Sequence, residues 1–212
     1  MPSHALKRED FESLVAGGAV IVDVRPVDEF VKEHFAGSIF ISPNRRRLPS
    51  VLRACVTPPS PIVLVAGDES VAEAAQKLVA ETGEYRVAGT VSVEMGWASS
   101  LRYPTESLAV MSVGELVGRI AAPARDFRLV DVREPFEWKL GYIDGSALVS
   151  LKEVKASSEH WDRKEEIVCI CEEGLRSTSA ASLLKRHGFR AATTVKSGIA
   201  EWFSSKLPLR EP

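Results

Sequence analysis

The chain has little of what marks secreted, membrane-bound or nucleic-acid-binding proteins. It contains three cysteines, Cys55, Cys169 and Cys171, too few and too unevenly spaced for a disulfide framework or a zinc ribbon. No apolar run approaches the roughly 18 residues that span a bilayer, and the N-terminus lacks the apolar segment of a signal peptide. The net charge of −2 gives no electrostatic case for nucleic acid. We therefore expect a cytoplasmic protein with no nucleic-acid or membrane partner, no metal and no cofactor.

Two stretches of the chain repeat each other about half its length apart. Residues 22–30 read VDVRPVDEF and residues 130–138 read VDVREPFEW, so Asp131 lies 108 residues after Asp23. The apolar run 62–65 recurs as 167–170, at an offset of 105 residues. A period this long indicates two duplicated domains and not a solenoid, whose units have about 20–50 residues.

Short apolar runs alternate with amphipathic patterns in both halves. We expect strands at 19–24, 38–41, 62–65, 129–132, 147–149, 167–170 and 192–195, and helices that include 8–16, 71–80, 112–121 and 151–156. Ser112 and Glu115 form the pattern of a capping box. This alternation predicts an α/β fold in which each domain has a small parallel sheet flanked by helices on both faces. We place the domains at 1–104 and 105–212, joined by a linker at 99–110 that contains Pro104.

Residues 167–178 combine a buried strand, a tight loop and the start of a helix. About six residues, beginning with Cys171, separate the apolar run from the helical pattern, and Gly174 lies in the middle of them. The positive end of a helix dipole and unpaired backbone N–H groups converge on such a loop. Both favour a charged thiolate at Cys171, which makes this residue the candidate nucleophile.

The loop resembles the active-site loop of rhodaneses, sulfurtransferases that carry a persulfide on a cysteine. Residues 171–177 read CEEGLRS and match the pattern C-x-x-G-x-R-S. The Asp-Val-Arg turn of both halves and the Gly198-x-x-x-Trp202 ending also match the family. The resemblance implies tandem rhodanese-like domains, transfer of a sulfane sulfur through Cys171, and a small molecule or protein as donor and acceptor. It implies that the substrate is bound by the rest of the loop, which comprises Glu172, Glu173, Gly174, Leu175, Arg176 and Ser177.

Each loop position suggests a role. We expect Gly174 at positive φ, Arg176 facing the pocket to bind an anionic group, and Ser177 and Thr178 capping the helix. Sulfur transfer needs a sulfur that a donor can reach, so we expect Cys171 to be exposed. The carboxylates of Glu172 and Glu173 disfavour a dianion such as thiosulfate.

The remaining motif residues are expected to be structural. Asp131, Arg133 and Glu137 tie the strand end to neighbouring loops, and Cys169 lies in the core because it precedes the loop within the strand. The loop of the first half begins at Ala66 and contains neither cysteine nor arginine. The N-terminal domain therefore lacks a nucleophile and is expected to be catalytically inactive.

Two other functions compete with sulfur transfer. Cysteine phosphatases and some arsenate reductases place a cysteine and an arginine around a similar loop, but with Cys-x5-Arg spacing. Here Cys171 and Arg176 have Cys-x4-Arg spacing, and the smaller ring suits a single sulfur atom better than a phosphoryl group. A non-catalytic sulfur-sensing or docking module is the third interpretation, and it is weakened because the loop retains Cys, Gly and Arg.

Overall fold

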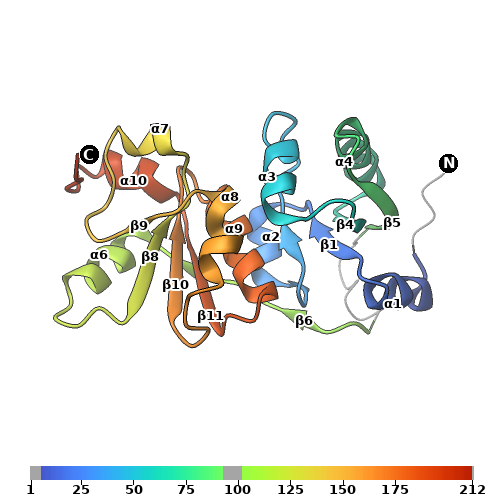
Figure 1. Cartoon of the computed structure of the whole chain (residues 1–212), viewed down its shortest axis with the longest axis horizontal. Coiled ribbons are helices and arrows are strands. Elements are labelled where there is room, and N and C mark those ends of the chain that lie inside the picture. The colour runs from blue at the N-terminus through green and yellow to red at the C-terminus, as the bar shows by residue number, and fades with distance from the viewer. Residues whose placement is uncertain (1–5, 93–101, 212) are drawn as a thin grey trace. The chain divides into compact units, whose positions relative to one another are not determined.

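The computed structural model describes residues 6–92 and 102–211. The chain divides into two compact units, Met1–Ser107 and Leu108–Pro212, which are described here one at a time. Both units have an α/β fold with a parallel sheet between helices (Figure 1), so the predicted fold class is confirmed.

The sheet of the first unit has the strand order β3-β1-β4-β5, and every neighbouring pair is parallel. Its strands are β1 (Val20–Asp23), β3 (Ile39–Phe40), β4 (Pro61–Ala66) and β5 (Arg86–Ser92). Its helices are α1 (Arg8–Ala16), α2 (Val27–Lys32), α3 (Leu48–Cys55) and α4 (Glu69–Glu81). Phe11 of α1 packs against Ile21 and Val63 on one face of the sheet. Helices α3 and α4 lie on the other face (Figure 1).

The sheet of the second unit has the order β7-β11-β10-β8-β9 and is also parallel. Its strands are β7 (Ala109–Met111), β8 (Phe127–Asp131), β9 (Ala147–Leu148), β10 (Glu166–Ile170) and β11 (Ala191–Val195). Its helices are α6 (Val113–Ala121), α7 (Pro135–Trp138), α8 (Leu151–Ser158), α9 (Leu175–Arg186) and α10 (Gly198–Ser204). Four strands follow the order of the first unit, β9-β8-β10-β11 against β3-β1-β4-β5, which agrees with the sequence duplication.

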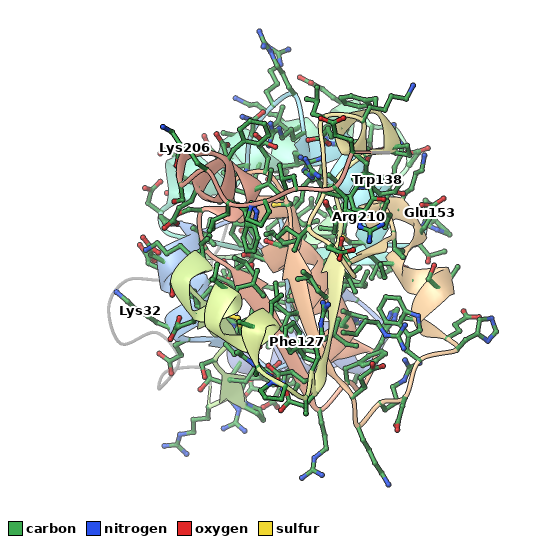
Figure 2. All side chains as sticks on the ribbon, turned by 90° about the vertical axis from the view of Figure 1, so that its left-hand side faces the viewer. Lys32, Phe127, Trp138, Glu153, Lys206 and Arg210 are labelled. Carbon is green, nitrogen blue, oxygen red and sulfur yellow. The ribbon has the colours of Figure 1, made fainter. Side chains whose placement is uncertain are left out.

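The two faces of the second sheet are covered by different helices. Val168 and Ile170 of β10 share a core with Leu116 of α6 and Trp202 of α10. Phe127 closes this core near the start of β8, and the Arg119 guanidinium lies 4.4 Å from the centre of its ring (Figure 2). Helices α8 and α9 cover the opposite face (Figure 1). Because strand side chains alternate, Cys169 points to that opposite face.

The predicted linker at 99–110 contains the boundary between the two units, which lies after Ser107, but its described part includes two short strands. Thr105–Glu106 form β6, which pairs antiparallel with β2 (His34–Phe35) of the first unit. Ala109–Met111 form β7, which pairs with β11 of the second unit. The residues that we assigned to the start of the second domain therefore belong partly to the first unit. Residues 99–101 of the expected linker lie outside the described part of the chain.

The sequence analysis also missed α3, β2 and β5, whereas the elements that it predicted form within a few residues of their expected bounds. The capping box of α6 is confirmed, because the Ser112 hydroxyl accepts from the Glu115 N–H and the Glu115 carboxylate accepts from the Ser112 N–H. Across residues 6–92 and 102–211, the helices are too short or too polar to cross a bilayer.

Candidate active site

The candidate loop is shorter than the sequence predicts. Strand β10 ends at Ile170 and α9 begins at Leu175, so the connection is the four residues from Cys171 to Gly174. Gly174 has φ +90°, which confirms the expected positive φ and turns the chain into the helix early. A Cβ atom on Gly174 would lie 3.4 Å from the Val195 carbonyl oxygen. This is an ordinary contact distance, so the positive φ is what favours glycine at this position.

Ser177 and Thr178 do not cap the helix as expected. Both lie in the first turn of α9, and their hydroxyls donate to the Gly174 carbonyl oxygen at 2.9 and 2.7 Å. No side chain caps the N-terminus of α9. The positive end of the helix dipole therefore remains available to an anion beside Cys171.

Cys171 is buried, contrary to our expectation of exposure. The residue is 1% exposed, and its Sγ lies 3.5 Å from the Ser177 Oγ. The Ser177 hydroxyl in turn lies 2.8 Å from the Thr194 Oγ1 on the adjacent strand β11. The sulfur thus lies against the Ser177 hydroxyl, whose proton can turn toward the sulfur when it is anionic.

The turn between β11 and α10 is bonded to the loop backbone. The Ile199 N–H donates to the Cys171 carbonyl at 2.8 Å, and the Ala200 N–H donates to the Glu172 carbonyl at 3.1 Å. Gly198 precedes them with φ +55°, and a Cβ there would lie 2.2 Å from the Cys171 carbonyl oxygen. Only glycine fits this approach, which explains the Gly198-x-x-x-Trp202 motif at the site.

Arg176 is held by Glu137 and does not stand open to the pocket as expected. Its two Nη atoms donate to the two Glu137 carboxylate oxygens at 2.5 and 2.7 Å, and the side chains are 12% and 15% exposed. Burial alone would raise the pKa of Glu137, but the Arg176 and Glu134 N–H donors bring it below its ordinary value. This ion pair joins α9 to α7, a contact between residues 39 positions apart.

Two buried side-chain N–H groups of the second unit have no acceptor among the described residues. They are the Nε of Arg176 and the Nε1 of Trp138, the residue that follows Glu137 (Figure 2). Glu137 takes one N–H from each Nη of Arg176, so the unpartnered Nε–H is among the N–H groups that remain to donate to an incoming group.

The other predicted loop residues form a partly exposed acidic edge. Glu173 is exposed, whereas Glu172 and Leu175 are half-buried. The loop therefore carries two carboxylates near the thiol, and the charge of its one arginine is balanced by Glu137.

Asp131 and Arg133 are structural, as predicted. The Asp131 carboxylate accepts from the Arg133 Nε and Nη2, and that Nη2 also donates to the Gly141 carbonyl at 2.8 Å. Asp23 and Arg25 form the same buried pair in the first unit. Its presence in both units shows that the pair does not depend on Cys171.

The corresponding loop of the first unit differs at the start of its helix. The Asp68 side chain caps α4, accepting from the Val71 N–H at 2.9 Å. An anion of the chain itself thus occupies the position that α9 leaves uncapped. The other thiols are core residues: burial raises the pKa of Cys169, as it does that of Cys55 to about 12.

Two surface hollows lie away from the loop, about 540 and 480 Å³ in volume. They are lined by residues near the starts of β8 and β10, such as Phe127 and Glu166. In the described part of the chain, no group of three His, Cys, Asp or Glu side chains could hold a metal ion.

Comparison with known proteins identifies the family. The family model of the rhodanese-like domain matches residues 7–99 and 112–205 of the sequence. The chain therefore belongs to the rhodanese-like family and contains two copies of its domain.

Individual relatives match over part of their length. The chain is 31% identical over 139 residues to "Rhodanese-like domain-containing protein 15, chloroplastic" of Arabidopsis thaliana, covering 60% of this chain and 72% of that protein. It is 26% identical over 98 residues to "Sulfurtransferase" of Allochromatium vinosum, covering 46% and 92%. It is 30% identical over 86 residues to "Probable adenylyltransferase/sulfurtransferase MoeZ" of Mycobacterium tuberculosis, covering 40% of this chain but 22% of that protein.

Sequence reasoning missed the contact of Thr194 with Ser177, the residue beside the thiol, and the pairing of Glu137 with Arg176. The ends of parallel strands meet at one edge of a sheet, and this rule could have indicated Thr194. No local signal in the sequence indicates that Glu137 lies beside Arg176.

Proposed function

We propose that the protein is a sulfurtransferase in which Cys171 carries the transferred sulfur as a persulfide. The observation that supports this most strongly is the difference between the two units. Cys171 precedes a helix whose N-terminus has no side-chain cap, whereas the first unit has Ala66 in place of the thiol and Asp68 as a cap. A site for an anionic sulfur is thus present in one copy of the duplicated fold.

The proposed reaction has two balanced steps. The Cys171 thiolate attacks the outer sulfur of a donor R–S–S⁻, the donor S–S bond breaks, R–S⁻ leaves and a Cys171 persulfide anion forms. An acceptor nucleophile then attacks the outer sulfur of that persulfide, the S–S bond at Cys171 breaks and the thiolate re-forms. With cyanide as acceptor the product is thiocyanate. Neither step needs a metal, a cofactor or an external oxidant.

The residues around the sulfur have separate roles in this scheme. The α9 dipole and the Ser177 hydroxyl stabilise the anion. Gly174 allows the turn that follows Cys171, and Gly198 allows the backbone before α10 to approach the Cys171 carbonyl oxygen. The Arg176 Nε–H can donate one hydrogen bond to the donor, and the edge formed by Glu172, Glu173 and Leu175 meets the rest of the donor molecule.

The burial of Cys171 adds a requirement. Because the Cys171 residue is 1% exposed, we propose that the site opens before each transfer. The donor and acceptor are a small molecule or a protein that carries a sulfane sulfur, and we propose that the first unit is catalytically inactive.

Transfer assays with two classes of substrate test this function. With a sulfane donor and cyanide, we expect thiocyanate from the wild-type protein and none from Cys171→Ser. With an aryl phosphate, we expect no phosphate release. Phosphate release that depends on Cys171, without thiocyanate formation, would instead support the cysteine phosphatase. A protein that binds a sulfur compound but forms neither product would be a sensing or docking module.

A further inference from the structure

The ion pair beside the thiol has a consequence for which donors the site accepts. Arg176 is the one basic residue of the loop, and both of its Nη atoms are bonded to Glu137 at 2.5 and 2.7 Å. A planar guanidinium binds an oxyanion best through two parallel N–H bonds. Here one such pair, formed by the two Nη atoms, is already occupied by a carboxylate of the chain, which also balances the charge of the guanidinium.

The charges around the loop are therefore unfavourable for a dianion. The Arg176–Glu137 pair has no net charge, while Glu172 and Glu173 contribute two negative charges within two residues of Cys171. Because the pair is mostly shielded from water, the opposite charges within it are screened little by solvent. A dianionic donor would have to displace Glu137 from Arg176 or approach an arginine whose charge is already balanced.

We infer that Glu137 is a specificity-determining residue that turns the site away from dianionic donors such as thiosulfate and toward organic persulfides of low net charge. This inference rests on the proposed sulfur transfer through Cys171. An organic persulfide needs one hydrogen-bond donor and a nearby anion-stabilising helix end, and the unpartnered Arg176 Nε–H and the uncapped α9 provide these. An ammonium group on the donor would also be favoured by Glu172 and Glu173.

The duplication provides a matched control for this residue. Glu29 occupies the position of Glu137 in the first unit, 108 residues earlier. Its carboxylate lies 3.9 Å from Arg25 and is 53% exposed, and the residue that corresponds to Arg176 is Val71. Replacing Glu29 removes the same charge from the protein without releasing an arginine at the loop.

The experiment measures how fast sulfur is loaded onto Cys171 by two donors, thiosulfate and cysteine persulfide, using mass spectrometry of the Cys171 peptide. For the wild-type protein we expect cysteine persulfide to load faster. In Glu137→Gln the ratio of the thiosulfate rate to the cysteine persulfide rate should rise about tenfold, because the released guanidinium can pair with the dianion. Glu29→Gln should keep the wild-type ratio. Adding Arg176→Ala to Glu137→Gln should remove the gain.

Other cations near the site cannot produce this pattern. Lys152 lies 4.0 Å from Glu134, and Lys196 is exposed on the turn before α10, but both are present in every variant. Should Glu137→Gln fail to fold, the exposed Glu173→Gln tests the same electrostatics with an expected increase of about twofold in the ratio.

The outcomes separate the two proposals. Loading of Cys171 by both donors at a ratio that Glu137→Gln leaves unchanged would overturn the specificity role while leaving sulfur transfer intact. An increase that persists after Arg176→Ala would also overturn it. If neither donor places sulfur on Cys171, the proposed function fails and the inference fails with it.

Discussion

The backbone N–H of Ile199 donates a hydrogen bond to the carbonyl oxygen of Cys171 over 2.8 Å. This bond joins the start of α10 to the residue that we propose carries sulfur, although the two are 28 positions apart in the chain. It forms because Gly198 has no side chain: a Cβ there would overlap the Cys171 and Glu172 carbonyl oxygens at 2.2 and 2.6 Å. The geometry of the loop thus depends on a segment that follows it in the chain.

We predict that Gly198→Ala lowers the free energy of unfolding by about 3 kcal/mol, because the methyl group meets backbone and φ is +55°. Thermal or urea unfolding measures the change. Gly118→Ala is the control, since it lies inside α6 with open space around the added Cβ and should be stabilising by about 0.5–1 kcal/mol. Equal stability of the wild-type and Gly198→Ala proteins would show that the close approach does not exist in solution.

We predict that Arg176→Ala lowers stability by about 2 kcal/mol, because it leaves the mostly buried Glu137 carboxylate without its partner. Adding Glu137→Gln should recover part of the loss, since the unpaired charge is then gone. The four proteins of this double-mutant cycle are compared by urea unfolding. Additive losses would mean that the two side chains do not interact in solution.

We predict that stability falls as the pH decreases from about 7 to 5, and that His34 contributes to the fall. Burial lowers the pKa of His34 from its ordinary value of 6.5, although the Phe30 carbonyl, Glu106 and Asp23 partly oppose this shift. The unfolded chain therefore binds the proton first. The stabilisation is fully present above about pH 6.5 and is lost as the pH falls toward the lower value of the folded protein.

The variant His34→Gln should flatten this dependence in thermal unfolding between pH 7 and pH 5. The pKa of His187 in the second unit is also lowered, first by burial and then by Lys155 and Arg163. His187→Gln should therefore remove a separate part of the pH dependence, and stability should change least with pH in the double variant. If the stability of His34→Gln depended on pH as strongly as that of the wild-type protein, His34 would not contribute to the fall.

We predict that inserting a thiol into the first unit does not create a second site. In Ala66→Cys the new side chain would precede α4, whose N-terminus is already capped by Asp68. Sulfur loading of this variant should remain at one site per chain, as measured by peptide mass spectrometry. Loading of the introduced thiol together with Cys171 would mean that the uncapped helix end is not what distinguishes the two units.

The strand, loop and helix around Cys171 could be predicted because their signals are local. The apolar run ends at Ile170, Gly174 allows the turn, and the pattern of α9 follows directly. Because the sequence is duplicated, four strands of the second unit are expected to have the same order as those of the first. By contrast, the short strand β7 has three residues and follows Pro104 and a polar run, so it resembled a linker until its pairing with β11 was known.

What could not be predicted depends on contacts between distant segments. The burial of Cys171 involves Ser177 and the turn before α10, and the charge state of the loop depends on Glu137 from α7. Neither pairing has a sequence pattern, because any carboxylate near the end of a strand could have reached Arg176. These contacts correct two expectations, the exposed sulfur and the open arginine.

The most direct measurement is the mass of the full chain after incubation with cysteine persulfide and removal of excess donor, followed by peptide mapping. We predict one added sulfur atom per chain, about 32 Da, on Cys171, its absence from Cys171→Ser and its retention in Cys169→Ala. Release of that sulfur by cyanide should restore the original mass. Sulfur on Cys169 or Cys55 with Cys171 unmodified, or no added sulfur at all, would contradict the central claim.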